Sequence, residues 1–264
     1  MSQITKELNK IRRRINDLEE MIIKMEVDEE KDIHKLDQAY SERIRLYRLY
    51  KRLQHAYPIK SAEWDILREL EKNLQIRILH INEVEQNNTA YYSSNKNGIS
   101  ELVIRDSHFS TIPESICELT SLRKLILINN KISHFPESFT NLEFLKELNL
   151  NSNSIHNLPD FISNLRLLKR LVLSNNNLTQ LPESLFNLEF LTHLSLDNNK
   201  LNKISKSISK LKNLDFLTLN GNKLTYLPNS FSELRGLFFM DLRNNFLTEA
   251  HLPFIRSRDS HILV

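Results

Sequence analysis

A pattern of 23 residues recurs without a break from Ile99 to about Leu247, and no other property of the chain restricts its fold as strongly. Each unit reads LxxLxLxxNxLxxLPxxxxxLxx. The first positions of the seven units are Ile99, Leu122, Leu145, Leu168, Leu191, Leu214 and Leu237. A constant period over so many units predicts a solenoid, in which each unit is one supersecondary element stacked on the next.

The first half of each unit predicts a strand followed by a turn. Positions four and six, such as Leu125 and Leu127, are apolar between polar neighbours, which is the alternation of a short strand with one buried face. We expect these strands to stack into a parallel sheet. Position nine is an amide that can pair with backbone groups left unpaired where the strand ends, so we expect a buried ladder. Its members are Asn130, Asn153, Asn176, Asn199, Asn222 and Asn245, and Ser107 stands there in the first unit.

The second half of each unit predicts a convex segment. Apolar residues at positions eleven, fourteen, eighteen and twenty-one complete the core, as Ile132, Phe135, Phe139 and Leu142 do in one unit. A proline at position fifteen begins an irregular or short helical segment, because proline suits a first helical turn. These prolines are Pro113, Pro136, Pro159, Pro182 and Pro228. Ser205 replaces the proline in one unit, where we expect the turn to be less firmly specified.

The unit length and the LP-[ED]-S segment resemble those of intracellular leucine-rich repeat proteins of the Ras-group-related type. The resemblance covers about 150 of the 264 residues. It implies an α/β solenoid with a parallel sheet on the concave face, and it implies protein interaction without specifying a partner. A signalling scaffold that engages small GTPases or their regulators is the alternative that the resemblance suggests.

The first third of the chain has a different pattern. Residues spaced alternately four and three apart form a heptad seam, which predicts a helix that needs a partner. The seam consists of Ile4, Leu8, Ile11, Ile15, Leu18, Ile22 and Met25. After the acidic residues 28–30, a second helical pattern runs through Ile33, Leu36, Tyr40, Ile44, Tyr47 and Leu53, and Tyr57-Pro58 ends it. We predict an antiparallel helical hairpin or short coiled coil over residues 1–57.

This hairpin has two possible roles. It either folds on itself and on the first repeat, shielding the core there, or its seam at residues 4–25 pairs with a second copy or another protein. In the second case Arg12-Arg13-Arg14 and Glu19-Glu20 would select the partner by charge.

Residues 58–98 connect the hairpin to the repeats and are predicted to form their N-terminal cap. Ser61 can begin a helix that carries Trp64, Leu67, Leu70 and Leu74, and a strand is expected around Ile76, Ile78 and Ile81. Asn97-Gly98 lies between Tyr91-Tyr92 and Ile99–Leu102, which predicts a β-hairpin leading into the first repeat. Residues 99–264 are then the repeat domain with a C-terminal cap.

Composition and motifs favour a cytoplasmic protein without catalytic activity. The chain lacks an apolar run of the roughly 18 residues that a membrane helix needs, and its start has no apolar signal core. Its single cysteine, Cys117, is expected to be partly exposed and unreactive. A net charge of +3 gives no case for nucleic acid. The three glycines form no phosphate-binding loop, and the nine histidines lack the HExxH spacing, so we expect no catalytic residue, cofactor or metal.

The concave face is the candidate binding surface, because positions two, three, five, seven and eight are expected to face solvent there. It carries a basic group relieved by Glu147, a neighbouring apolar group at Val103, Ile126, Ile128 and Val172, and an aromatic group toward the last repeats that also includes Phe246. The predicted protein-binding residues are Arg123, Lys124, Lys146, Lys169, Arg170, Phe216, Phe238 and Phe239. The alternative for the aromatic group is that Phe254-Ile255 or residues 261–264 cover it as a cap. The sequence therefore predicts a non-catalytic protein-interaction module.

Overall fold

The computed structural model describes residues 10–11, 13–22, 33–55, 61–80, 89–95, 97–248 and 261–263. It separates the chain into two compact units, Met1–Pro58 and Ile59–Val264, which are described in turn.

The first unit is a helical hairpin. A helix over residues 13–22 packs against α2 (Ile33–His55), with Leu18, Ile22 and Ala39 forming a small buried cluster. Ion pairs also join the helices: Arg14 Nε lies 3.1 Å from Glu42 Oε1, and a terminal nitrogen of Arg43 lies 3.0 Å from Glu19 Oε1. The hairpin is as predicted, and the four seam residues that the structure describes, Ile11, Ile15, Leu18 and Ile22, are buried. Ile4, Leu8 and Met25 lie outside the described residues.

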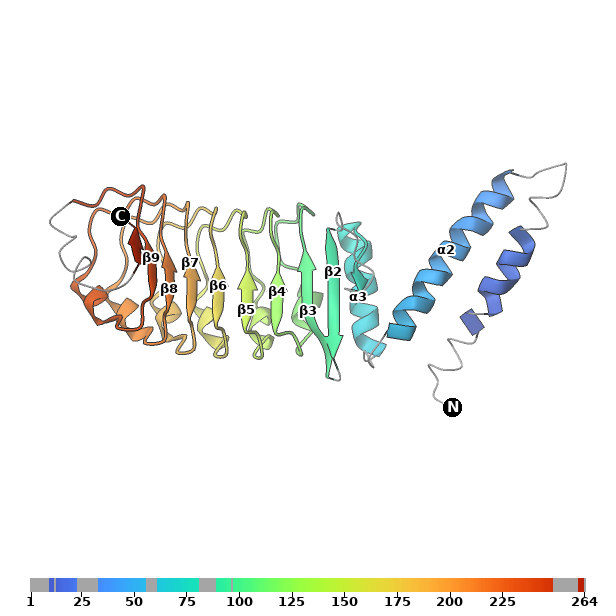
Figure 1. The fold of residues 1–264 in the computed structure, drawn as a ribbon, viewed down its shortest axis with the longest axis horizontal. Coiled ribbons are helices and arrows are strands. Elements are labelled where there is room, and N and C mark those ends of the chain that lie inside the picture. Colours follow the sequence, from blue (N-terminus) through green and yellow to red (C-terminus); the bar gives the residue numbers. More distant parts are fainter. Residues whose placement is uncertain are drawn as a thin grey trace. The chain divides into compact units, whose positions relative to one another are not determined.

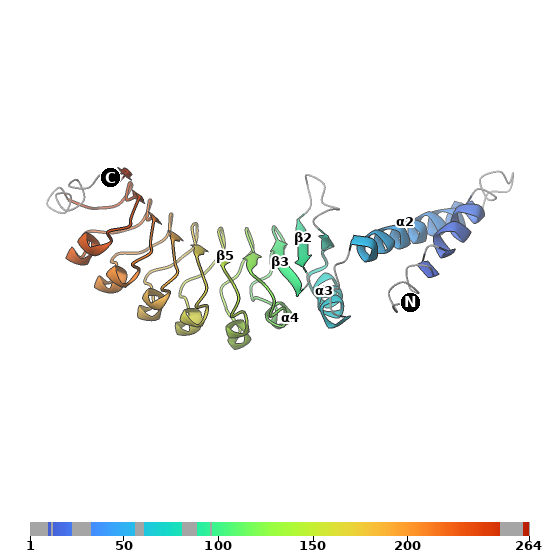
Figure 2. The same ribbon diagram turned by 60° about the horizontal axis from the view of Figure 1, so that its bottom comes forward.

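The second unit is a solenoid built on one sheet (Figures 1 and 2). The sheet has ten strands in sequence order: β1 (Leu79–His80), β2 (Ala90–Asn95), β3 (Gly98–Ile104), β4 (Lys124–Ile126), β5 (Glu147–Asn149), β6 (Arg170–Val172), β7 (His193–Ser195), β8 (Phe216–Thr218), β9 (Phe239–Asp241) and β10 (His261–Leu263). Only the β2–β3 pair is antiparallel, which confirms the hairpin predicted at Asn97-Gly98. The other neighbours are parallel, and Figure 2 shows the strands on the inner side of a curved stack.

Short helical segments form the outer side of the stack. They are α4 (Glu114–Cys117), η2 (Glu137–Asn141), η3 (Asp160–Asn164), η4 (Glu183–Asn187), η5 (Lys206–Lys210) and η6 (Asn229–Glu233). A proline precedes all of them except η5, as the sequence predicts. The expectation for Ser205 was wrong. This residue adopts the same extended backbone as the prolines, and its hydroxyl accepts a hydrogen bond from the Ser207 amide, so a side-chain cap replaces the fixed ring.

The asparagine ladder is present and supports every strand-to-turn transition in the repeats. Asn176 is typical: its Nδ2 donates to the carbonyls of Leu150 and Leu173 at 3.0 Å, and its Oδ1 accepts from the Ile155 amide at 3.0 Å. Each ladder side chain thus bonds to backbone of the preceding unit as well as its own. The buried amides hold the units in register because no water replaces these bonds.

A second column, at position eight, has left-handed backbone. The residues there are Asp106, Asn129, Ser152, Asn175, Asn198, Gly221 and Asn244, with φ between 51° and 68°. Asparagine, aspartate and glycine tolerate this conformation better than other residues. The column turns each strand away from the sheet, directly before the ladder asparagine.

Both ends of the solenoid carry additional structure. At the start, α3 (Ser61–Leu74) adds Ile66, Leu67 and Leu70 to the repeat core. The buried carboxylate of Glu63 accepts a hydrogen bond from the Ile99 amide at 3.3 Å. At the other end, β10 pairs with β9, and Ile262 packs against the core.

Cys117 corrects a prediction, because it is fully buried and not partly exposed. The reason is that α4 packs against α3, which turns the inner side of this short helix into core. Burial raises the pKa of the thiol to about 11.

Candidate functional site

The inner side of the sheet is the candidate site, and the strand register aligns its side chains in columns. Position three forms one continuous column, in which each residue pairs with the next across neighbouring strands. From β3 to β9 this column reads Glu101, Lys124, Glu147, Arg170, His193, Phe216 and Phe239. It changes from alternating charges to aromatic rings at β7. The concave face therefore has two chemically different halves.

The first half is a charge ladder. Lys124 Nζ lies 3.2 Å from Glu101 Oε1 and 3.9 Å from Glu147 Oε2, and Arg170 Nε lies 3.8 Å from Glu147 Oε1. Burial lowers the pKa of Lys124, but the hydrogen bond and charge of Glu101, together with the charge of Glu147, outweigh it and raise this pKa. Two of the five predicted basic residues are thus paired within the column. Glu101, which the sequence reasoning overlooked, was recognisable as the position-three residue of the first unit.

The other three predicted cations form a separate row at position two. Backbone hydrogen bonds join them directly: the Lys146 amide donates to the Arg123 carbonyl, and the Lys169 amide donates to the Lys146 carbonyl, each at 2.8 Å. Lys146 and Lys169 are exposed, and Arg123 is half-buried. None of the three forms an ion pair with another residue that the structure describes. The structure therefore divides the predicted basic group between two rows.

The predicted apolar surface beside the charges is mostly absent. Val103, Ile126 and Val172 are expected to face solvent at position five, but they are 0 %, 6 % and 9 % exposed. Neighbouring strands lie only about 4.8 Å apart, so a short branched side chain inside the sheet leaves little area open to solvent. Ile128, at position seven, is half-buried. The position-five residues therefore contribute packing and little binding surface.

The second half contains an aromatic cluster formed by His193, Phe216, Phe238 and Phe239. The rings of His193 and Phe216 are stacked, with centroids 4.4 Å apart and an interplanar angle of 15°. Phe238 lies edge-on to Phe216 at 5.8 Å, and Phe239 lies tilted to it at 6.2 Å. The structure brings together the three predicted phenylalanines and adds His193. The overlooked signal was the position of this histidine, one unit before Phe216 in the same column.

The aromatic cluster is accessible among the described residues. Phe238 is 55 % exposed, and His193, Phe216 and Phe239 are half-buried. Phe246, which the sequence placed in the same group, is 67 % exposed but stands at position ten, beyond the end of β9. Of the segment that the sequence suggested as a cover, His261–Leu263 extends the sheet as β10. Phe254-Ile255 lies outside the described residues.

Burial, followed by the charge of Arg170, lowers the pKa of His193, which keeps its ring neutral and stacked near pH 7.

A polar network adjoins the aromatic cluster at positions five and seven. Asp197 accepts hydrogen bonds from the Thr218 hydroxyl at 2.6 Å and from the Asn220 amide at 2.9 Å. Asp241 accepts from the Arg243 guanidinium at 2.7 Å, and this bond lowers the pKa of the carboxyl. The two bonds to Asp197 run between units, and so does a bond of 3.3 Å from Asn220 Nδ2 to Asp241, so they fix the polar surface beside the rings. The cluster consequently lies on a rigid support.

The described residues contain no group of three or more histidine, cysteine, aspartate or glutamate side chains placed to hold a metal ion. Nor does any helix among them combine the length and apolarity needed to cross a membrane.

Two family models match the repeats. A model described as a leucine-rich repeat region matches residues 104–200, and one described as a leucine rich repeat matches residues 190–247. Residues 104–247 form a leucine-rich repeat domain. No curated protein matches the chain.

Solved structures share the leucine-rich repeat fold. A leucine-rich repeat protein of Leptospira interrogans has 25 % sequence identity and a TM-score of 0.54, and the match covers 75 % of this chain and 57 % of that one. An internalin of Listeria monocytogenes has 20 % identity and a TM-score of 0.52, with coverage of 65 % and 51 %. The chain thus spans little more than half the length of either protein. Neither the family models nor these structures indicate a catalytic family.

Proposed function

We propose that this leucine-rich repeat domain is a non-catalytic protein-interaction module whose partner binds the concave face at the aromatic cluster. Leucine-rich repeat domains commonly mediate protein–protein interaction. The observation that carries the proposal here is the mutually packed set of rings on the concave face, of which Phe238 is exposed and the others are half-buried. Aromatic residues dominate the energetics of protein interfaces because they bury a large area with few rotatable bonds.

The surroundings of the cluster support a binding role. Hydrogen bonds between units hold the neighbouring carboxylates in place, so little conformational entropy is lost when a partner docks. The charge ladder on β3 to β6 presents alternating signs next to the rings. Such a surface selects partners by charge pattern, while the rings supply most of the affinity.

Affinity capture tests this proposal. The full chain and a Phe238→Ala/Phe239→Ala variant are used to capture proteins from a lysate of the source organism, and the captured proteins are identified by mass spectrometry. Each lost anchor is expected to cost about 2 kcal/mol, which is roughly a thirtyfold loss of affinity. Tyr226→Ala is the matched control, because Tyr226 is 44 % exposed and lies away from the concave face. Equal recovery by all three proteins would reject the aromatic cluster as the site.

The signalling role implied by the repeat type has its own test. A panel of small GTPases, each loaded with GDP or a GTP analogue, is measured for binding to the full chain. Binding that the Phe238→Ala/Phe239→Ala variant loses assigns a GTPase as the partner, whereas absence of binding removes this role.

A further inference from the structure

A second exposed surface lies where each chain segment enters its strand, and the aromatic cluster does not include it. At position twenty-three, directly before the sheet, three successive units carry Phe144, Leu167 and Phe190. Phe144 is 52 % exposed and Phe190 is 50 % exposed, whereas Leu167 is half-buried. The packing of the solenoid does not require these large apolar side chains, since Asn213 and Gly236 occupy the same position in later units.

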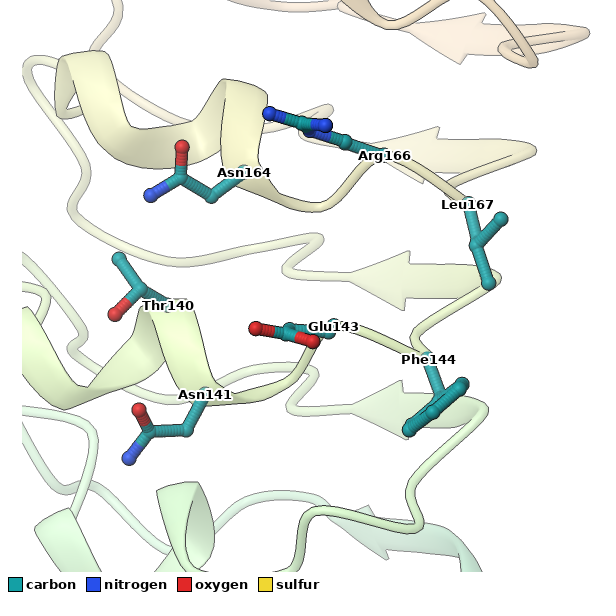
Figure 3. Close-up of a pocket in the computed structure, with 7 residues that line it drawn as sticks. All are labelled: Thr140, Asn141, Glu143, Phe144, Asn164, Arg166 and Leu167. Atoms are coloured by element: carbon teal, nitrogen blue, oxygen red, sulfur yellow. The ribbon is translucent and has the colours of Figure 1, made fainter.

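A groove opens between two units beside this apolar row. It has a volume of about 670 Å³ and is lined by Thr140, Asn141, Glu143, Phe144, Asn164, Arg166 and Leu167. Figure 3 shows Phe144 and Leu167 at the starts of neighbouring strands, with Glu143 and Arg166 further back toward the helical turns. Such a groove accommodates a polypeptide segment better than it accommodates a flat surface.

The cations of position two lie beside the apolar row but are offset from it by one unit. Lys146 and Lys169 follow Phe144 and Leu167 by two residues, whereas Arg123 belongs to the preceding strand and Thr192 follows Phe190. Arg123, Lys146 and Lys169 are adjacent through backbone hydrogen bonds of 2.8 Å. Like these three, Arg166 in the groove makes no ion pair with any other described residue. Neighbouring strands lie about 4.8 Å apart, so the three side chains of position two span about 10 Å. These cations are not ion-paired within the described surface, so their side chains are available to an acidic ligand.

The two rows suit an extended chain that crosses the units between them. Successive side chains of an extended segment point to opposite sides, so one side can contact Phe144, Leu167 and Phe190 while the other reaches the cations. Three or four residues of such a segment cover about 10 Å, which is the span of either row. We propose that this strand-entry surface binds an acidic, extended polypeptide segment in which carboxylate and aliphatic side chains alternate.

A membrane is the less suitable occupant of the same surface. Glu143 and Glu189 directly precede Phe144 and Phe190 in the chain. Anionic lipid headgroups would be repelled by these two carboxylates wherever the rings approached a bilayer. A peptide can place its acidic residues only on the side of the cations.

Fluorescence anisotropy of the full chain tests the proposal. The probe is a labelled decapeptide of alternating Glu and Leu, and its comparison is a peptide of the same composition with the Glu and Leu residues in separate blocks. We expect the alternating peptide to bind more tightly. Lys146→Glu/Lys169→Glu and, separately, Phe144→Ala/Phe190→Ala are expected to weaken it by about tenfold or more. The control Lys200→Glu/Lys223→Glu reverses two exposed lysines at position ten and should change binding less than about twofold.

Three results would overturn this assignment. The first is that the alternating peptide does not bind the folded wild-type chain. The second is that the Lys146→Glu/Lys169→Glu variant binds this peptide as tightly as the wild type does. The third is that the chain binds phosphatidylserine vesicles and not the peptide, and that both double variants lose this vesicle binding. Circular dichroism of each variant verifies that it is folded. The proposal is independent of the aromatic cluster, so Phe238→Ala/Phe239→Ala should leave peptide binding unchanged.

Discussion

Removal of one ladder asparagine should destabilise the domain strongly, and the structure allows the loss to be worked out. In Asn153→Ala, the carbonyls of Leu127 and Leu150 lose donors at 2.8 and 2.9 Å, and the Ile132 amide loses its acceptor at 3.0 Å. Asn153 is 8 % exposed, so water does not replace these partners. At about 1 kcal/mol for each unsatisfied group, the free energy of unfolding should fall by about 3 kcal/mol.

Asn245→Ala is the matched control for this prediction. Asn245 makes equivalent bonds to the Leu219 and Leu242 carbonyls and from the Leu224 amide, at 2.9, 2.8 and 3.0 Å. It is half-buried, so water can reach the freed groups, and we expect a loss of about 1 kcal/mol. A domain of this size loses about 2–4 °C in melting temperature for each kcal/mol.

Urea unfolding followed by circular dichroism, with calorimetry as a second measurement, gives both losses. The decisive quantity is the difference between the two variants, because their broken bonds are the same and their burial differs. Equal losses, or a loss below about 1 kcal/mol for Asn153→Ala, would refute the argument that buried amides hold the units in register. A reduced m-value in Asn153→Ala would show in addition that the halves of the solenoid unfold separately.

Three further predictions concern single side chains. The Cys117 thiol has a pKa of about 11, so at pH 8 it should react slowly with a disulfide reagent. We expect the rate in the native chain to be at least about a hundredfold lower than in the urea-unfolded chain. Comparable rates would contradict the burial of this thiol. Ser152→Asn, at a φ of 56°, should raise the free energy of unfolding by about 0.5 kcal/mol, whereas Ser154→Asn, outside the left-handed column, should not. In an NMR titration the pKa of His193 should lie below that of an exposed histidine and rise in Arg170→Ala but not in Lys200→Ala. Because folding lowers this pKa, the contribution of His193 to stability should be lost as the pH falls through it.

Much of the solenoid could be predicted because one period encodes several independent physical requirements. Apolar residues at positions four and six, asparagine at nine and proline at fifteen each specify one part of the backbone path. They agree in most units, and Ser107 and Ser205 are exceptions. The left-handed column was equally visible, since position eight is asparagine in four units and glycine in another. It was overlooked because the sequence reasoning treated position eight only as solvent-facing.

The surface was harder to predict, because exposure depends on neighbours and not on the pattern. Val103 and Ile126 point out of the sheet but are covered by adjacent side chains, and Cys117 is buried by a helix outside the repeats. The pairing of Lys124 with Glu101 follows from strand register, which becomes certain only when the units are aligned in space. The repeat period thus predicts the backbone fold, but it does not predict the exposure or the pairing of the solvent-facing side chains.

The division of labour within each unit has a consequence for how such a protein changes over time. The residues that determine the architecture (the inward leucines, the ladder asparagines and the turn residues) are almost entirely separate from those of the position-three column. Substitutions in the position-three column can therefore change the binding surface without destabilising the fold. The position-three column changes from alternating charges to aromatic rings at β7, which illustrates how its residues can vary independently of the fold. Libraries randomised only at position three should therefore yield new binders with an unchanged scaffold.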